Sequence, residues 1–311
     1  EKIFNELQSG KRISPKKQEA ISILEKFRNH PAPFIKDFHP SVKPISKTKQ
    51  LEFLLPSRLL NNISWFIKLN LAYFLKKERD YTDEIPWYSI WDKIKRKCRK
   101  LRGYNDLYSK PDFNEKFAFY PLQLQPEIST MLMAPLYTDQ ITNIRHIARS
   151  LPMEFKLYVK EHFNMFGFRP RSYYKELLKI PNVKLIDPTF PGFDLIQNAK
   201  LIFVLTATTG WEAVFLKKPV ITFGEIFYNA LSMVKQCHSF EELPHIIKKQ
   251  LENFQHNEEE LVNFISAILE DSIHADIYTL WEKDRSDERR AKEDAGLKMM
   301  AENIAKKMDI I

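Results

Sequence analysis

From Lys116 onward the sequence alternates short apolar runs, rich in β-branched and aromatic residues, with stretches of helical periodicity. Strands that alternate with helices are joined by crossovers that return the chain to the same edge of a sheet, so the strands run parallel. The pattern therefore predicts an α/β fold with one Rossmann-like, doubly wound parallel sheet over residues 114–240. Five strands are expected, over residues 117–122, 155–160, 183–186, 201–205 and 220–223.

Helices are expected between these strands and on both sides of the sheet domain. With about 150 residues per domain, a chain of this length holds roughly two domains. We predict a mainly helical region over 1–113, the sheet domain over 114–240, and C-terminal helices over 241–311. Helical periodicity places the helices at Lys16–Phe27, Pro56–Glu78, Trp87–Arg102, Thr138–Ser150, Ser172–Ile180, Phe193–Ala199, Gly210–Leu216, Phe240–Phe254, Glu258–Glu270 and Arg285–Met308.

The net charge indicates the class of partner, and the cysteine content indicates the redox compartment. Lys and Arg number 48 against 40 Asp and Glu, a net charge of +8, which suits a nucleotide, a phospholipid surface or nucleic acid. Cys98 and Cys237 do not make a disulfide framework, which favours a reducing compartment. The longest apolar stretch, 63–75, is too short for a membrane span and is interrupted by Lys68. We therefore expect a cytoplasmic protein.

The segment after the fourth predicted strand has the composition of an anion site. Thr206, Thr208 and Thr209 follow the strand, and Gly210 opens the expected helix. Ligands of open α/β sheets bind beyond the carboxyl ends of the strands, and a helix N-terminus favours a phosphate there. The hydroxyls can donate, and Gly210 can let the backbone approach the ligand. The alternative is that Thr208 or Thr209 only caps the helix.

Glu212 is expected on the first turn of that helix. Its carboxylate can accept hydrogen bonds from ribose hydroxyls, as acidic residues do in nucleotide-binding folds. It can equally well only complement the helix dipole.

Basic side chains follow the second predicted strand at the same edge of the sheet. Lys160 and His162 can neutralise a diphosphate or the carboxylate of a donor sugar, and Arg169 and Arg171 follow within one loop. The alternative is a solvated, charged loop. The apolar residues that separate these cations count against it: Phe163, Met165, Phe166 and Phe168.

Polar residues also follow the first predicted strand. Gln125 and Glu127 can contact a sugar, and Glu127 can act as a general base. The alternative is that Pro126 and Glu127 form only a turn and a helix start. Asp139 fits a helix cap better than a catalytic group.

Residues 93–102 carry seven basic side chains and no acid. Such a run can bind anionic lipid, or it can be a solvated helix face. It lacks the interleaved aromatic residues of a nucleic-acid site, so we expect no nucleic-acid partner. No metal-ligand spacing, P-loop or nucleophile-elbow motif is present, and we expect no metal.

Seven segments form an ordered set along the chain: 120–127, 157–162, 173–177, 180–183, 206–213, 218–220 and 223–224. As a set they resemble the bacterial capsule polysaccharide biosynthesis family, including its Kdo transferases. The resemblance covers residues 114–240. The family is similar to GT-B glycosyltransferases, in which two Rossmann-like domains face each other across a cleft and the C-terminal one holds the donor nucleotide.

The resemblance implies a glycosyltransferase with a donor domain of the GT-B type. It would place the phosphates of a CMP- or UDP-linked sugar at Lys160, His162 and the segment 206–210, with no other cofactor. Phe163 stands where the family usually has proline. The partners would be the donor and a glycan or lipid-linked acceptor. Separately, and from its charge alone, the segment 93–102 is expected to face the inner surface of the bacterial inner membrane.

A GT-B enzyme needs two Rossmann-like domains, and only one is visible in this sequence. The helical region 1–113 is then a remnant of an acceptor-side domain or packs against one. The chain begins at Glu1 without a methionine, so the acceptor-side domain is expected upstream. A sugar-nucleotide epimerase, a glycerophosphotransferase and a non-catalytic assembly subunit stay open as alternatives.

Overall fold

A computed structural model of the chain describes residues 1–32, 55–75, 85–273 and 295–308. Its contacts group the chain into two compact units, Pro31–His256 and Glu1–His30 with Asn257–Ile311. This grouping differs from the boundaries at 113/114 and 240/241 expected from the sequence. The difference at the second boundary arises because α11 (Leu243–Glu252), expected among the C-terminal helices, packs on the sheet domain.

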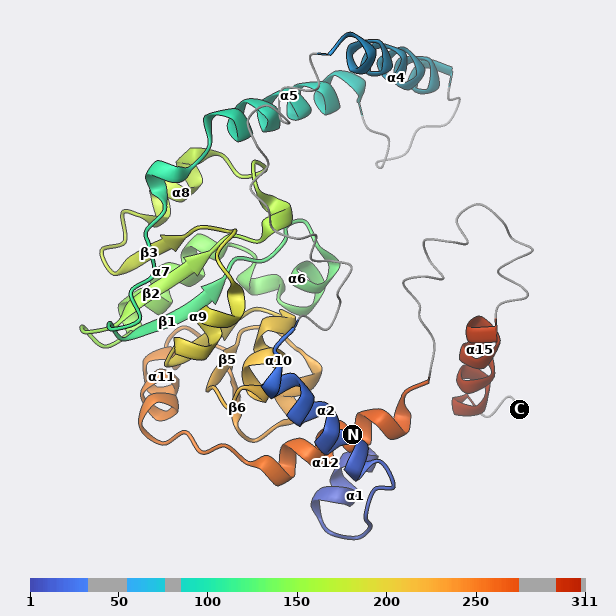
Figure 1. Cartoon of the computed structure of the whole chain (residues 1–311), viewed down its shortest axis with the longest axis vertical. Coiled ribbons are helices and arrows are strands. Elements are labelled where there is room, and N and C mark those ends of the chain that lie inside the picture. Colours follow the sequence, from blue (N-terminus) through green and yellow to red (C-terminus); the bar gives the residue numbers. More distant parts are fainter. Residues whose placement is uncertain (33–54, 76–84, 274–294, 309–311) are drawn as a thin grey trace. The chain divides into compact units, whose positions relative to one another are not determined.

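The larger unit contains a six-stranded parallel sheet in the order β3-β2-β1-β4-β5-β6 (Figure 1). The predicted α/β fold is confirmed. The five expected strands are present, and the short strand β6 was not predicted. The strands are β1 Phe117–Pro121, β2 Lys156–Lys160, β3 Val183–Ile186, β4 Leu201–Val204, β5 Val220–Thr222 and β6 Val234–Gln236.

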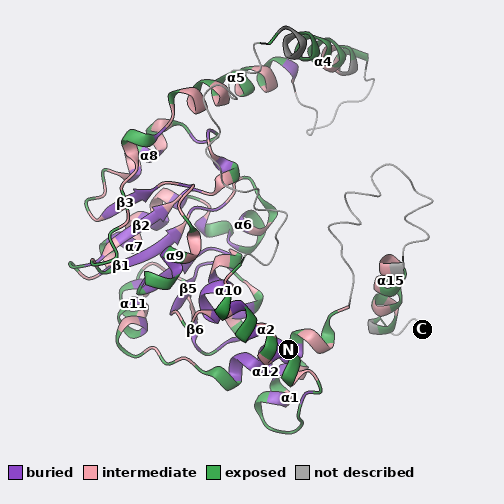
Figure 2. Ribbon diagram, viewed as in Figure 1, coloured by how far each residue is buried: buried purple, intermediate pink, exposed green. Residues whose placement is uncertain are grey.

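Both faces of the sheet are covered, which explains why its strands read as apolar runs rather than as alternating patterns. All residues of β4 and β5 are buried (Figure 2). Helix α7 (Gln140–Ser150) packs on β2, α8 (Arg171–Leu177) on β3, and both contact each other. Helix α10 (Thr208–Phe215) packs on β4 and β5. Because the strand order reverses between β1 and β4, right-handed crossovers place α10 on the opposite face.

The remaining elements of this unit are two long helices before β1 and several short segments. Pro86 begins α5, and Gly103, with φ +70°, ends it. No described helix is both long enough and apolar enough to cross a bilayer. The elements are α4 Pro56–Leu75, α5 Pro86–Arg102, α6 Ile128–Met133, α9 Gly192–Asn198 and the 3₁₀ turns η3 Asn105–Leu107, η4 Pro135–Tyr137, η5 Phe163–Met165 and η6 Phe227–Ala230.

The helices of the smaller unit are α1 Lys2–Gln8, α2 Lys17–Asn29, α12 Glu258–Asp271 and α15 Ala295–Lys307. In this unit the N-terminal helices α1 and α2 pack on α12. The rings of Phe4 and Phe264 meet edge to face at 5.0 Å, and Arg28 pairs with Glu258 at 2.5 Å. The part of the expected helix 285–308 before residue 295 lies outside the described residues, as does the end of the expected helix 56–78.

Candidate functional site

The carboxyl edge of the sheet has a topological switch point between β1 and β4, where ligands of open α/β folds bind. The loops after these two strands contact each other there. The hydroxyl of Thr206, after β4, donates to Oε1 of Gln123, after β1, at 3.4 Å. The structure therefore brings the predicted Thr206 beside a residue that the sequence did not single out.

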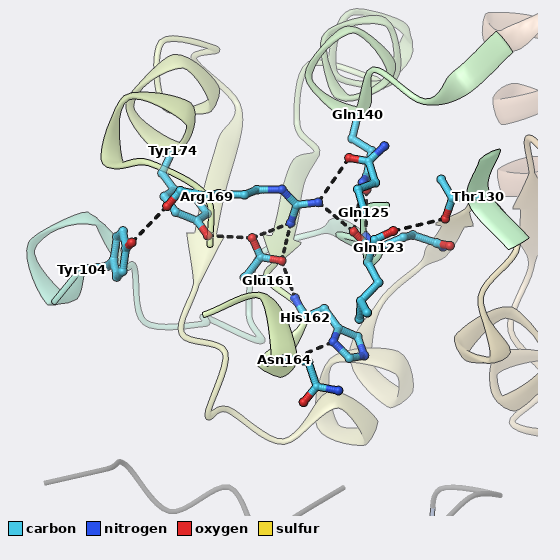
Figure 3. Close-up of polar contacts among 11 residues, drawn as sticks. Tyr104, Gln123, Gln125, Thr130, Gln140, Glu161, His162, Asn164, Arg169 and Tyr174 are labelled. Carbon is cyan, nitrogen blue, oxygen red and sulfur yellow. Dashed lines mark hydrogen bonds and ion pairs between the residues drawn. The ribbon is translucent and has the colours of Figure 1, made fainter. Parts of the chain in front are cut away.

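A buried ion pair fixes the loop after β2 (Figure 3). The Arg169 guanidinium donates to both carboxylate oxygens of Glu161, at 2.5 and 2.6 Å, and to the carbonyl of Gln123 at 2.7 Å. Tyr174 also donates its hydroxyl to Glu161, at 2.7 Å. Burial acts to lower the pKa of Arg169, but the Glu161 charge raises it overall. Arg169 therefore braces the loops after β1 and β2 rather than presenting its charge to a ligand.

Two glutamines hold the loop after β1. The side-chain oxygen of Gln140 accepts from Gln123 N–H at 2.8 Å, and its Nε2 donates to the Gln123 carbonyl at 3.1 Å. Gln125 donates to the carbonyl of Thr138, and its Oε1 accepts from Arg169 at 3.4 Å. The predicted sugar-contacting side chain of Gln125 is thus already engaged within the protein.

The side-chain nitrogen of Gln123, Nε2, is buried and has no hydrogen-bond partner within the described ranges. An unpaired buried donor costs about 1–3 kcal/mol, so an acceptor atom placed there would be favoured. This donor lies at the switch point, because the other atom of the same amide group accepts from Thr206. Gln123 and Glu161 lie within the segments 120–127 and 157–162 that carry the family resemblance. The sequence predicts no bracing role for them or for Gln140, because polar residues after strands are common.

Lys160 is the last residue of β2 and is half-buried. Burial lowers the pKa of its ammonium group to about 8, and the charges of Asp187 and Glu161 oppose that shift. Among the residues that the structure describes, none forms a hydrogen bond or ion pair with Nζ. At pH 7 the group is mostly protonated, so a receptive cation stands at the carboxyl edge.

His162 follows the same strand and is positioned by its neighbours. Its N–H donates to Glu161 at 2.7 Å, and its Nδ1 accepts from the N–H of Asn164 at 3.2 Å. In the neutral ring the proton is then on Nε2. Lys160 and His162 therefore lie at one strand end, as predicted from their spacing, while the nearby Arg171 pairs with Asp106.

The threonine-rich turn differs from the prediction in where its helix begins. Helix α10 begins at Thr208, not at Gly210, and its N-cap residue is Ala207. The alternative of a cap from Thr208 or Thr209 is therefore wrong. Thr208 is exposed and Thr209 half-buried, and no described group accepts from their N–H groups. These two donors stay available to an anion.

Gly210 serves packing within the protein. A Cβ atom there would lie 2.9 Å from Cζ of Tyr228 and 2.9 Å from Cγ2 of Val204. Tyr228 fills this space and donates its hydroxyl to the Ala207 carbonyl at 2.7 Å. The absence of a side chain at Gly210 is thus explained by the tyrosine ring beneath the turn, and not by the predicted approach of a phosphate.

Glu212 lies in the second turn of α10, because the helix begins earlier than expected. The alternative prediction, that the Glu212 carboxylate only complements the helix dipole, is therefore wrong, because that interaction is limited to the first turn. The carboxyl group is buried, and burial raises its pKa to about 7. No hydrogen bond or ion pair from the described residues satisfies it. Thr208 and Glu212 lie four residues apart and share one face of the helix.

Glu127 and Asp139 both lie at helix starts. Asp139 caps α7 and accepts from the N–H groups of Ile141 and Thr142, at 3.1 and 3.2 Å, as predicted. Glu127 is the exposed N-cap residue of α6 and makes no capping bond with its side chain. The alternative prediction of a turn and helix start at Glu127 is confirmed, and its side chain faces solvent.

Most of the larger unit, Pro31–His256, is similar to known proteins. The family model described as "Capsule polysaccharide biosynthesis protein" matches residues 68–265. Protein FixF of Sinorhizobium fredii is 28% identical over 134 residues, which cover 41% of this chain and 31% of FixF.

Two solved structures of Thermosulfurimonas dismutans KpsC are also similar. The chain named beta Kdo 2,7 transferase has 18% identity and a TM-score of 0.37, and the match covers 64% of this chain and 57% of that one. The chain named beta Kdo 2,4 transferase has 19% identity and a TM-score of 0.33, and the match covers 64% of this chain and 59% of that one. The chain therefore spans less than two thirds of the length of each of these relatives.

Proposed function

The chain belongs to the capsule polysaccharide biosynthesis family, and we propose that it is a GT-B-like glycosyltransferase that acts on a nucleotide-sugar. The sugar passes from a CMP- or UDP-linked donor to a glycan or lipid-linked acceptor. The observation that carries the proposal is the half-buried Lys160, a cation without an ion-pair partner among the described residues, at the carboxyl edge of a sheet whose switch point is polar.

The donor phosphates are assigned to Lys160, His162 and the N-terminus of α10. Lys160 supplies a charge, and the N–H groups of Thr208 and Thr209 supply oriented donors at the positive end of a helix. Donors preorganised around a leaving phosphate stabilise the transition state as charge develops on it. Thr206, already close to Gln123, lies after β4 at the same edge of the sheet.

Glu212 is assigned to the ribose. A buried carboxylate without a described partner is stabilised by hydroxyl donors, and a ribose carries two neighbouring ones. Glu127 is assigned as the general base for the acceptor hydroxyl, because its exposed carboxylate begins α6 just after the β1 loop.

Residues 93–102 are assigned to the anionic inner surface of the bacterial membrane, where a lipid-linked acceptor would be presented. This assignment places the protein in the cytoplasm at the membrane periphery. It rests on seven basic side chains and the absence of acids in that segment.

Calorimetric titration of CMP, CDP and UDP tests the proposal. The wild-type protein should bind at least one of them, and Lys160→Ala should weaken that binding at least tenfold. Lys200→Ala is the matched control, since this exposed lysine precedes β4 at the opposite edge of the sheet. Binding that is absent from the wild type, or unchanged in Lys160→Ala, would contradict the donor site.

Product analysis separates the alternatives on the same scaffold. A transferase should release free nucleotide from its donor only when an acceptor is present. Interconversion of nucleotide-sugars without an acceptor would instead identify an epimerase.

A further inference from the structure

Helix α4 has two apolar faces, and α5 contacts one of them. Trp65, Leu69 and Tyr73 recur every four residues and share a face. The Lys93 ammonium lies 3.2 Å from the ring centroid of Trp65, and the Tyr73 ring meets Trp87 at 6.2 Å. Both contacts come from α5, so this face of α4 is partnered.

The second apolar face, which we call the α4 stripe, is not covered by any element that the structure describes. Its residues follow spacings of three, four, four and three, and at 100° per residue they lie roughly 160° from the face that contacts α5. Each is between 47% and 67% exposed. A contiguous apolar stripe of this kind marks an interaction surface. The stripe consists of Leu60, Ile63, Ile67, Leu71 and Phe74.

The start of α5 adds aromatic residues that suit a membrane interface. Trp87, Tyr88 and Trp91 are all more than half exposed. Tyrosine and tryptophan combine an apolar ring with a polar atom, and they are enriched where lipid headgroups meet water.

The charge around the stripe is positive. Residues 56–75 contain Arg58 and Lys68 and no acid. Helix α5 has seven basic residues and one acid, Asp92, which pairs with Arg96 on the same helix. An apolar helix face with cationic flanks complements an anionic lipid headgroup layer better than a neutral protein surface.

The second half of α5 is fixed to the sheet domain and contributes little to such a surface. Arg99 donates to the carbonyl of Phe168, and the Arg96 guanidinium lies 3.7 Å over the Phe168 ring. The aliphatic part of Lys100 packs against Gly167. Part of the basic run therefore binds the protein's own loop, and the first half of α5 and the α4 stripe are left as the lipid-facing part.

We propose that the α4 stripe, with the aromatic residues at the start of α5, inserts into the headgroup boundary of an anionic phospholipid leaflet. The inference rests on the surface contact proposed above and not on the transfer reaction. It changes the nature of that contact from charge alone to shallow apolar insertion. Because α5 is held by the loop that continues into Arg169, insertion would tether the sheet domain to the leaflet through that loop.

Co-sedimentation of the full chain with vesicles tests this inference. Wild-type protein should pellet with phosphatidylcholine vesicles that contain phosphatidylglycerol. Ile63→Asn/Ile67→Asn/Leu71→Asn should lower the partition coefficient at least tenfold. The matched control is Ile13→Asn/Met153→Asn, which changes two strongly exposed apolar residues elsewhere and should bind as the wild type does. Lys93→Glu/Lys95→Glu should weaken binding to the anionic vesicles.

Two further measurements keep the outcomes distinct. Far-UV circular dichroism reports whether the triple variant folds, and nucleotide titration reports whether its donor site is intact. A triple variant that loses vesicle binding but still binds nucleotide supports insertion, independently of the proposed transfer reaction. Vesicle binding by the triple variant equal to that of the wild type would overturn the inference. A wild-type dimer that the same substitutions dissociate, with vesicle binding unchanged, would assign the stripe to self-association and also overturn it.

Discussion

Substitution of Arg169 tests whether the buried ion pair holds the site together. Arg169→Met removes two hydrogen bonds to Glu161, one to the Gln123 carbonyl and a longer one to Oε1 of Gln125. Glu161 keeps the Tyr174 hydroxyl and the His162 N–H, but its charge stays buried without a cation. Breaking a buried pair from one side costs about 3–5 kcal/mol. We expect a loss of that size in the free energy of unfolding, measured by urea denaturation at pH 7.

The control is an ion pair of the same residue types at the surface. Arg145 and Glu176 are 3.5 Å apart and well exposed, so Arg145→Met should cost less than about 1 kcal/mol. The double variant Glu161→Gln/Arg169→Met should lose less than the sum of its single changes, because no lone charge is left buried. Equal losses in Arg169→Met and Arg145→Met would refute the bracing role.

Three further predictions follow from Gly210, Lys160 and Glu212. Gly210→Ala should lower the free energy of unfolding in urea by about 1–3 kcal/mol, because the added methyl group overpacks against Tyr228. In a double-mutant cycle, Tyr228→Phe should partly offset this loss. Fully additive effects of the two substitutions would exclude the contact. Nucleotide affinity should fall as pH rises through about 8, where Lys160 loses its proton, and titrations from pH 7 to 9 should show no such step in Lys160→Ala. Burial raises the folded-state pKa of Glu212 from 4.5 to about 7, so the ionised form disfavours folding, and wild-type stability should decline as pH rises between these values. Glu212→Gln should remove up to about 3 kcal/mol of that decline, measured by thermal unfolding at several pH values. If the stability of the variant depended on pH as that of the wild type does, a buried, unpaired carboxylate at Glu212 would be excluded.

The fold could be predicted because its signal is local. Buried parallel strands are apolar throughout, and β1 and β4 therefore stand out as runs in the sequence. β6 has three residues, of which only Val234 is buried, so neither length nor periodicity marks it. The start of α10 also differs from the prediction. The local sequence favours Gly210 as the opening residue, whereas Ala207, in an extended conformation, is the N-cap residue and the helix begins at Thr208.

The role of Gly210 could not be predicted, because its cause lies elsewhere in the chain. The ring that occupies the space beside it belongs to Tyr228, in η6 beyond the next strand. A glycine near a threonine-rich turn has the same local sequence whether it faces a phosphate or a tyrosine. Only the packing of η6 against the turn separates the two.

The basic residues near the site divide by type, and the division has a physical basis. Arg99, Arg169 and Arg171 each donate to backbone carbonyls of neighbouring loops, and Arg169 and Arg171 also pair with carboxylates. A planar guanidinium with five donors can satisfy several loop acceptors at once, and it is weakly hydrated enough to be buried there. An ammonium group is a compact charge with a stronger hydration shell, so Lys160 gains less from such bracing. In the loop after β2 the arginine side chains therefore fix the loop, and Lys160 at the strand end is left for the anionic ligand proposed above.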